Sequence, residues 1–154
     1  DSPTPGDYAA DIERARDELV EVARRCPEAT WGQPLSDEDP RSVGVVVDHV
    51  ADAYDYIGDF IRQLTSGGSP QLDGDVIDAL NLDHATRAGG VSLEEAVAHL
   101  SEKGDAVVQL VAGLSAGDLA AGDGRVARLA GIAARHADNH RAEIEAATAG
   151  GPGG

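Results

Sequence analysis

Aromatic residues and cysteine are both scarce in this chain, and each scarcity excludes a class of structure. Aromatic side chains account for 3% of the 154 residues, so the core must be built from Ala, Val, Leu and Ile. Such small side chains suit closely packed helices. The single cysteine, Cys26, excludes an internal disulfide bond and any zinc site made of several cysteines. Its position on the apolar face of the first expected helix favours a small core hydrophobe over a reactive thiol.

Long apolar runs are also absent. No stretch approaches the roughly 20 apolar residues that a transmembrane helix requires, and no signal-peptide pattern opens the sequence. We therefore expect a cytoplasmic protein without a membrane partner.

Positive charge is scarce as well. Lys and Arg together number 12 against 28 Asp and Glu, which gives a formal net charge of −16. Nucleic-acid phosphates and anionic membrane surfaces both require basic side chains, so we expect neither as a partner. The acidic residues are spread along the chain, which is typical of a solvated, self-repelling surface.

The chain instead shows helical periodicity over most of its length, because apolar residues recur every three to four positions. The pattern predicts four long amphipathic helices, one shorter helix and no strand. We expect these helices at residues 7–25, 43–65, 75–86, 93–114 and 125–148, the third being the shorter one. A connecting loop and a polar crossover are expected at residues 27–40 and 115–124.

Capping residues support two of the expected helix starts. Ser42 is the expected N-cap of the second helix. Ser92-x-x-Glu95 is a capping box, in which each side chain satisfies a backbone N–H of the first turn. We therefore predict an all-α four-helix bundle that forms one domain over residues 1–149, followed by a flexible, glycine-rich tail at residues 150–154.

Two histidines stand one helical turn apart in the last helix. His136 and His140 therefore point the same way, and both lie within about 20° of the centre of an apolar stripe that includes Leu129 and Ile144. An unpaired polar group in a core face costs roughly 1–3 kcal/mol, so both rings need partners. A divalent metal ion would satisfy both.

A third histidine, His49, lies about two turns into the second helix, at the edge of its apolar stripe. That position suits a side chain that reaches sideways toward a neighbouring helix. Two imidazoles from one helix and one from another would give three protein ligands, the number typical of catalytic zinc sites with one position left open. Imidazole also suits nickel, copper and iron, so the ligand type alone does not identify the metal.

Several motifs follow one another in a characteristic order. In chain order they are Trp31, the cap Ser42, Asp48-His49-Val50-Ala51, Asn81, Ser92-Leu-Glu-Glu, Leu114-Ser-Ala-Gly-Asp-Leu119 and His136-x-x-x-His140. This order resembles the DinB/YfiT-like superfamily, and the similarity spans residues 8–147.

The resemblance implies an antiparallel four-helix bundle of the DinB-like type, with a zinc or nickel ion at one end held by His49, His136 and His140. Characterised members of this superfamily include metal-dependent transferases and isomerases that act with low-molecular-weight thiols such as mycothiol or bacillithiol. The resemblance thus implies a small-molecule substrate, a reaction of the thiol S-transferase type and a homodimer. The sequence assigns no residue a catalytic role.

Three alternatives stay open at this stage. The metal ion could serve a hydrolase, or the chain could bind a metal or small ligand without turnover. The histidines of a purely structural bundle could also pair with backbone groups or water.

Several acidic residues lie near the three histidines in the sequence. Asp48, Asp52 and Asp138 are expected to be solvated, and the alternative is that they orient a ring N–H of a metal ligand. Glu143 is expected to extend into solvent rather than contact His140.

Four further residues have expected positions at or near the site. His84 is expected at the surface of a helix end, with the mouth of a pocket as the alternative, and His99 is expected to be exposed. Trp31 and Asn81 either border the pocket or serve local packing and loop hydrogen bonding.

Overall fold

The computed structural model describes residues 2–71 and 73–149, and within these ranges every regular element is a helix. The helices are α1 (Pro5–Arg25), α2 (Glu28–Trp31), α3 (Val43–Thr65), α4 (Gly74–Arg87), α5 (Leu93–Ala112), α6 (Ala116–Ala120) and α7 (Arg125–Ala149). The all-α class is confirmed, and the five expected helices agree with the structure to within about two residues at each end. The glycine-rich tail predicted at residues 150–154 lies outside the described residues.

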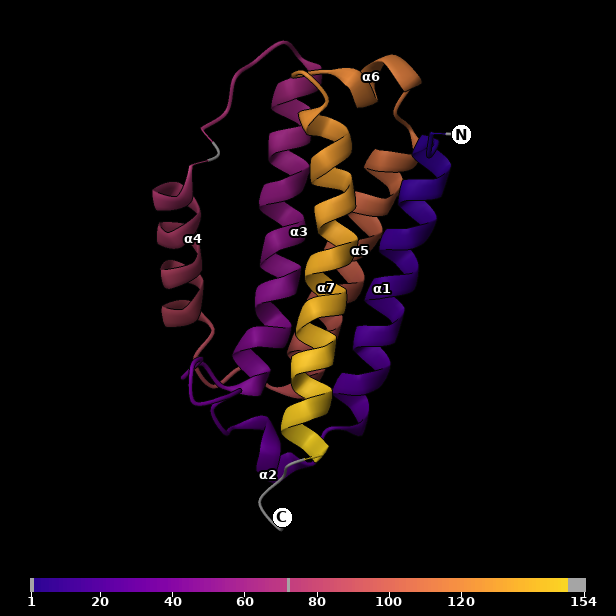
Figure 1. Cartoon of the computed structure of the whole chain (residues 1–154). Coiled ribbons are helices and arrows are strands. Elements are labelled where there is room, and N and C mark those ends of the chain that lie inside the picture. Colours follow the sequence, from indigo (N-terminus) through magenta and orange to yellow (C-terminus); the bar gives the residue numbers. More distant parts are fainter. Residues whose placement is uncertain (1, 72, 150–154) are drawn as a thin grey trace.

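The four long helices α1, α3, α5 and α7 pack side by side as a bundle (Figure 1). Helices α1 and α7 run in one direction and α3 and α5 in the other, so the two pairs are antiparallel to each other. Helix α4 leads the chain back along the bundle from the end of α3 to the start of α5. This crossover allows the neighbouring helices α3 and α5 to run parallel, and the predicted four-helix bundle is confirmed.

Both predicted caps are present. The Ser42 hydroxyl accepts a hydrogen bond from the Val45 N–H at 3.1 Å, and both hydrogen bonds of the Ser92–Glu95 capping box are formed. Helices α2 and α6 lie in segments that were expected to be a loop and a crossover. Each has at most five residues, which is too short to show an apolar period, although a capping box at Ser115 marks the start of α6.

Helix α3 forms the centre of the core. Every residue from Val43 to Ala51 is buried, because α5 and α7 cover the start of α3 from two sides and the loop before it contributes the buried Leu35. This half of α3 is therefore buried all round rather than on one stripe. His49 lies within it and is 2% exposed, although its expected place was the edge of the apolar face.

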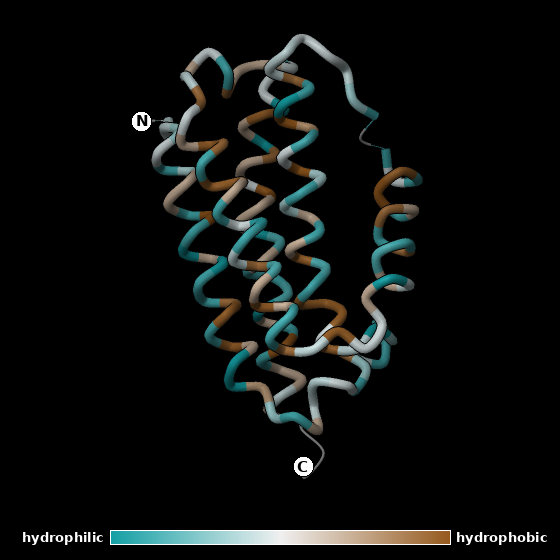
Figure 2. The backbone as a smooth tube through the Cα atoms, turned by 180° about the vertical axis from the view of Figure 1, so that it is seen from behind, coloured by the Kyte–Doolittle hydropathy of each residue, from teal (hydrophilic) through white to brown (hydrophobic). Residues whose placement is uncertain are grey.

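Helix α4 stands apart from the bundle and packs mainly against α3 (Figure 2). His84 is its one buried residue within the part of the chain that the structure describes. Hydrophobic residues in the first turns of α4, including Ile77, are only partly buried. The helix is thus attached to the bundle at few points.

Cys26 follows the last residue of α1 instead of lying within that helix. It is the C-cap residue, and Pro27 after it disfavours the helical conformation at this position. Its side chain is partly buried against the core, and this burial raises the pKa of the thiol. None of the described helices combines the length and the hydropathy needed to cross a membrane.

Candidate metal centre

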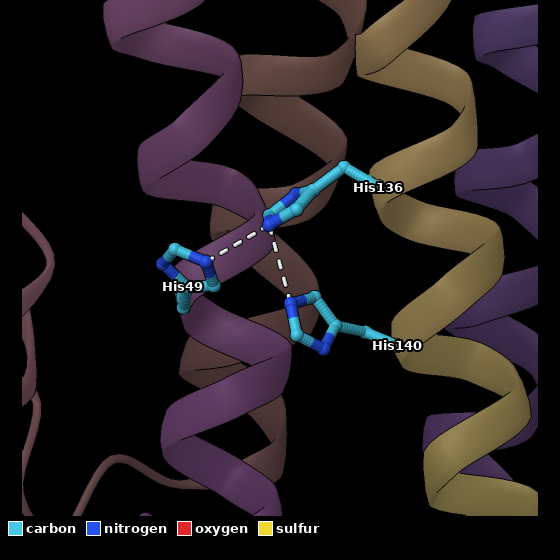
Figure 3. A group of neighbouring side chains, drawn as sticks. All are labelled: His49, His136 and His140. Carbon is cyan, nitrogen blue, oxygen red and sulfur yellow. Dashed lines mark hydrogen bonds between the residues drawn. The ribbon is translucent and has the colours of Figure 1, made fainter. Parts of the chain in front are cut away.

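The three histidines singled out in the sequence meet between α3 and α7. Nε2 of His136 faces Nε2 of His49 at 3.0 Å and Nε2 of His140 at 3.2 Å (Figure 3). Each of the three residues offers a ligand atom, and these atoms all lie within 4.8 Å of one another. The helical period brings His136 and His140 together, and the packing of α3 against α7 adds His49.

The spacing of the three nitrogens fits a single metal ion. A tetrahedral zinc ion holds nitrogen ligands at about 2.1 Å, which places neighbouring ligand nitrogens about 3.4 Å apart. Two of the separations, 3.0 and 3.2 Å, are only slightly shorter, and all three ligand atoms lie within 4.8 Å of one another, so small shifts of the side chains would make room for an ion.

The hydrogen-bonding capacity of the rings also favours a cation. A neutral imidazole has one N–H and one lone pair, so the Nε2 of His136 can form a good hydrogen bond to one facing nitrogen at a time. It faces two. A divalent cation would instead accept a lone pair from all three rings.

The surroundings keep these rings neutral, which is the form that binds metal. Burial, reinforced by the charges of His136 and His140, lowers the pKa of His49 to about 2. Burial and the neighbouring His140 lower the pKa of His136 to about 4. Burial also lowers the pKa of His140, although the nearby Glu143 carboxylate acts in the opposite direction.

Glu143 is exposed, as expected, but its carboxylate also contacts the predicted ligand His140. Its Oε1 atom lies 2.8 Å from Nδ1 of His140, an ion-pair distance without the N–H···O alignment of a hydrogen bond. The side chain is still 46% exposed, which is why the sequence pattern places it at the surface. A negative charge this close to Nδ1 favours the tautomer with the proton on Nδ1, which leaves the Nε2 lone pair for a metal ion.

Asp48 is buried and bridges two histidines outside the cluster, contrary to its expected solvation. Its carboxylate lies 2.8 Å from Nε2 of His84 and 2.7 Å from Nδ1 of His99. Burial raises the pKa of Asp48, but the hydrogen bonds from the two rings outweigh this effect and hold it below its usual value. Asp48 therefore joins α3 to α4 and α5.

His84 is only 2% exposed, so its expected surface position is wrong. Its ring centroid lies 5.8 Å from that of His49, which places it beside the three-histidine cluster. The expected exposure of His99 is confirmed, because its side chain is 48% exposed, but its bond to Asp48 was not foreseen. Asp48, the buried partner of both histidines, is on a different helix from either of them, so no helical period in the sequence reveals these contacts.

The two other aspartates near the ligands pair with arginines. Asp138 lies 2.9 Å from Arg14 of α1, and Asp52 lies 3.6 Å from Arg87 of α4. Asp138 therefore links α7 to α1, and Asp52 links α3 to α4, which differs from both simple solvation and the orientation of a metal ligand.

Trp31 serves local packing. Its Nε1–H donates to the carbonyl oxygen of Val91 at 3.0 Å, and its ring covers Gly44, where an added Cβ would lie 2.6 Å from the indole. Glycine at this position allows the close approach of the tryptophan to α3.

Asn81 borders a cavity of about 470 Å³ that lies between α3, α4 and α7, next to the histidine cluster. Its walls are mostly apolar, and the charged or titratable groups among them are His136, Tyr56 and two arginines. The lining residues are Tyr56, Ile57, Phe60, Ile77, Asn81, Arg125, Arg128, Leu129, Ile132 and His136. The apolar lining residues follow the same helical period as the core residues, so the sequence pattern does not distinguish the two groups. The sequence feature that could have indicated the two arginines of the cavity is the stretch from Gly124 to Ala137, which has three arginines and no acidic residue.

Comparison with known proteins agrees with this fold. The sequence pattern of the DinB superfamily matches residues 11–144, a range that includes all three histidines. No curated protein and no solved structure matches the chain significantly. Because the match covers most of the sequence, the chain belongs to the DinB superfamily.

Proposed function

We propose that this protein binds one divalent metal ion through His49, His136 and His140 and uses it to activate a small thiol. The observation that carries this proposal is the convergence of three neutral imidazoles, one buried and two half-buried, on one point. Zinc and nickel are the favoured ions, because imidazole suits both and because the family resemblance points to them.

Three protein ligands support a catalytic rather than a structural site. Structural zinc sites are usually closed by four protein ligands, whereas catalytic sites keep a position for water or substrate. His136 also lines the cavity, so a molecule in the cavity would lie next to a metal ligand. Such an ion would lower the pKa of a bound thiol or water and create a nucleophile at neutral pH.

The protein's own residues would prepare the site in two ways. Burial keeps the rings in their neutral, ligating form, and Glu143 orients His140. The apolar walls of the cavity would hold the body of an electrophilic substrate and limit the access of water. A thiol such as mycothiol or bacillithiol is proposed as the co-substrate on the strength of the family resemblance alone.

Metal binding can be tested by stripping the protein with a chelator and titrating it with zinc or nickel. Elemental analysis is expected to give about one ion per chain, with an increase in melting temperature. His136→Ala should lose both effects. His99→Gln is the matched control, because His99 is a histidine outside the cluster, and it should retain them. Equal metal content in the His136→Ala variant and the wild type would overturn the proposed ligand set.

Catalysis is a separate question from metal binding. The metal-loaded protein is incubated with a chloronitroaromatic electrophile and either mycothiol or bacillithiol, and thioether formation is measured. We expect turnover that depends on both the metal ion and the thiol. Stoichiometric metal without turnover with either thiol would instead support a binding protein, and hydrolysis without thiol would support a hydrolase.

A further inference from the structure

We infer that the cavity beside His136 binds an elongated small molecule with an apolar body and an anionic group at the end away from the histidine cluster. This inference rests on the proposed function, since it names the substrate class of the same site. The anionic group would pair with Arg125 and Arg128, which lie at the start of α7 and line the cavity.

The volume and the walls of the cavity suit the apolar body. About 470 Å³ lies within the usual range for small-molecule sites. Tyr56 and Phe60 line one wall with aromatic rings whose centroids are 5.8 Å apart. Ile132 lines another wall and is 41% exposed, although it is a large hydrophobic residue. An apolar ligand would cover this surface.

The two arginines carry charge that the protein does not neutralise nearby. Most other arginines of the chain lie within ion-pair distance of a carboxylate. Within the described residues, Arg125 and Arg128 have no such carboxylate. Their side chains instead donate to the backbone carbonyls of Gly122 and Asp123, at 3.1 and 3.2 Å. These bonds hold the two side chains and leave further N–H groups free for an anion.

The sequence around these arginines strengthens the argument. The protein has a net charge of −16, yet the stretch from Gly124 to Ala137 has three arginines and no acidic residue. A positive region in an otherwise acidic surface would attract an anionic ligand to this side of the molecule.

The length of the ligand follows from the distance along α7 between the arginines and His136. Arg128 precedes His136 by eight residues, which corresponds to about 12 Å at 1.5 Å per residue. The anionic group and the end of the ligand beside His136 are therefore separated by an apolar body on the order of 10 Å long.

Asn81 adds a polar contact along this path. Its side-chain oxygen is buried and accepts no hydrogen bond within the described part of the chain, although the residue lines the cavity. Buried polar groups normally have partners, so a donor on the ligand, such as a hydroxyl or an amide N–H, would complete this site.

The test compares the binding of octanoate, octanamide and octyl phosphate by calorimetry. The three probes share a similar apolar chain and differ in the end group. We expect at least one of the two anions to bind about tenfold more tightly than the neutral amide. Octanoate and octyl phosphate distinguish a carboxylate ligand from a phosphate ligand. Equal binding of the amide and both anions would overturn the inference.

Substitutions in and near the cavity test whether its arginines cause the preference for anionic probes. The double variant with Arg125→Gln and Arg128→Gln should lose the preference for the anion. Arg135→Gln should keep it, because Arg135 lies on the same helix and does not line the cavity. Ile132→Trp should weaken the binding of all three probes, since the larger side chain would fill the cavity. An anion preference that survives the double substitution would contradict the proposed role of the arginines.

Metal content separates this inference from the proposed function. Each titration is performed on chelator-treated and metal-loaded protein, because an anion could also bind the metal ion directly. We expect the anion preference in both samples. A preference seen only with metal would show that the anionic group binds the ion and would overturn this inference while supporting the metal site. A preference in a protein that binds no metal would leave the inference standing without the proposed function.

Discussion

Glu143 is an exposed residue that contacts the three-histidine cluster. Its carboxylate lies 2.8 Å from Nδ1 of His140, the nitrogen that does not face the other rings. Carboxylates in this position raise the affinity of a histidine for metal, and their loss typically costs 10-fold to 100-fold in affinity.

We therefore predict that Glu143→Gln weakens zinc binding by about tenfold, because the amide keeps the shape of the side chain and loses the charge. The measurement is a competition titration against a chelating dye. Glu145→Gln is the matched control, since Glu145 is on the same helix and pairs with Arg141. Similar affinities for both variants would argue against a specific role for Glu143.

Two glycines of α3 differ sharply in their surroundings. A Cβ at Gly44 would lie 2.6 Å from the Trp31 ring, whereas a Cβ at Gly58 would have its nearest neighbour at 3.5 Å. We predict that Gly44→Ala destabilises the protein by about 1–3 kcal/mol through overpacking. Gly58→Ala should instead stabilise it by about 0.5–1 kcal/mol through helix propensity. Urea denaturation of both variants provides the comparison, and equal shifts would contradict the packing argument.

Helix α4 depends on one buried contact for its attachment. His84 is its buried residue and bonds to Asp48 of α3, while Arg87 links the same two helices at the surface through Asp52. A buried hydrogen bond to a charged group contributes more than an exposed ion pair does.

We predict that His84→Leu loosens α4 and leaves the bundle folded. Hydrogen exchange of residues 74–87 should become faster by at least tenfold, while exchange in α1, α5 and α7 changes little. Arg87→Gln serves as the control for the surface link and should have a much smaller effect. If the two variants behave alike, the buried bond does not anchor the helix.

The pH dependence of stability belongs to the whole molecule. In the metal-free protein the folded-state pKa values of His49 and His136 are lowered to about 2 and about 4. Both lie below the value of about 6.5 expected in the unfolded chain. The unfolded state therefore takes up more protons below about pH 6.5, and stability falls as the pH falls from there toward the folded-state values.

We predict a loss of about 1 kcal/mol per pH unit for each of the two rings between pH 6 and pH 5, measured by chemical denaturation. Replacing both residues by leucine removes these titrations, so the double variant should show a flatter pH profile. An equally steep profile in that variant would assign the effect to other groups.

The homodimer implied by the family resemblance also stays a prediction at this scale, and light scattering would test it.

Local sequence features were sufficient for the five longer helices and for two of the three histidines of the candidate site. Apolar periodicity and the caps at Ser42 and Ser92 marked the helices, because both depend on residues within a few positions of one another. The spacing of His136 and His140 likewise requires them to share a face.

Tertiary packing decided the rest, because a helical period shows which way a side chain points and not what lies opposite it. His49 joined the cluster only because α7 packs against α3. Asp48, one position earlier, faces His84 and His99 instead. The cavity beside the cluster is bounded by α3, α4 and α7, and that arrangement depends on residues far apart in the sequence.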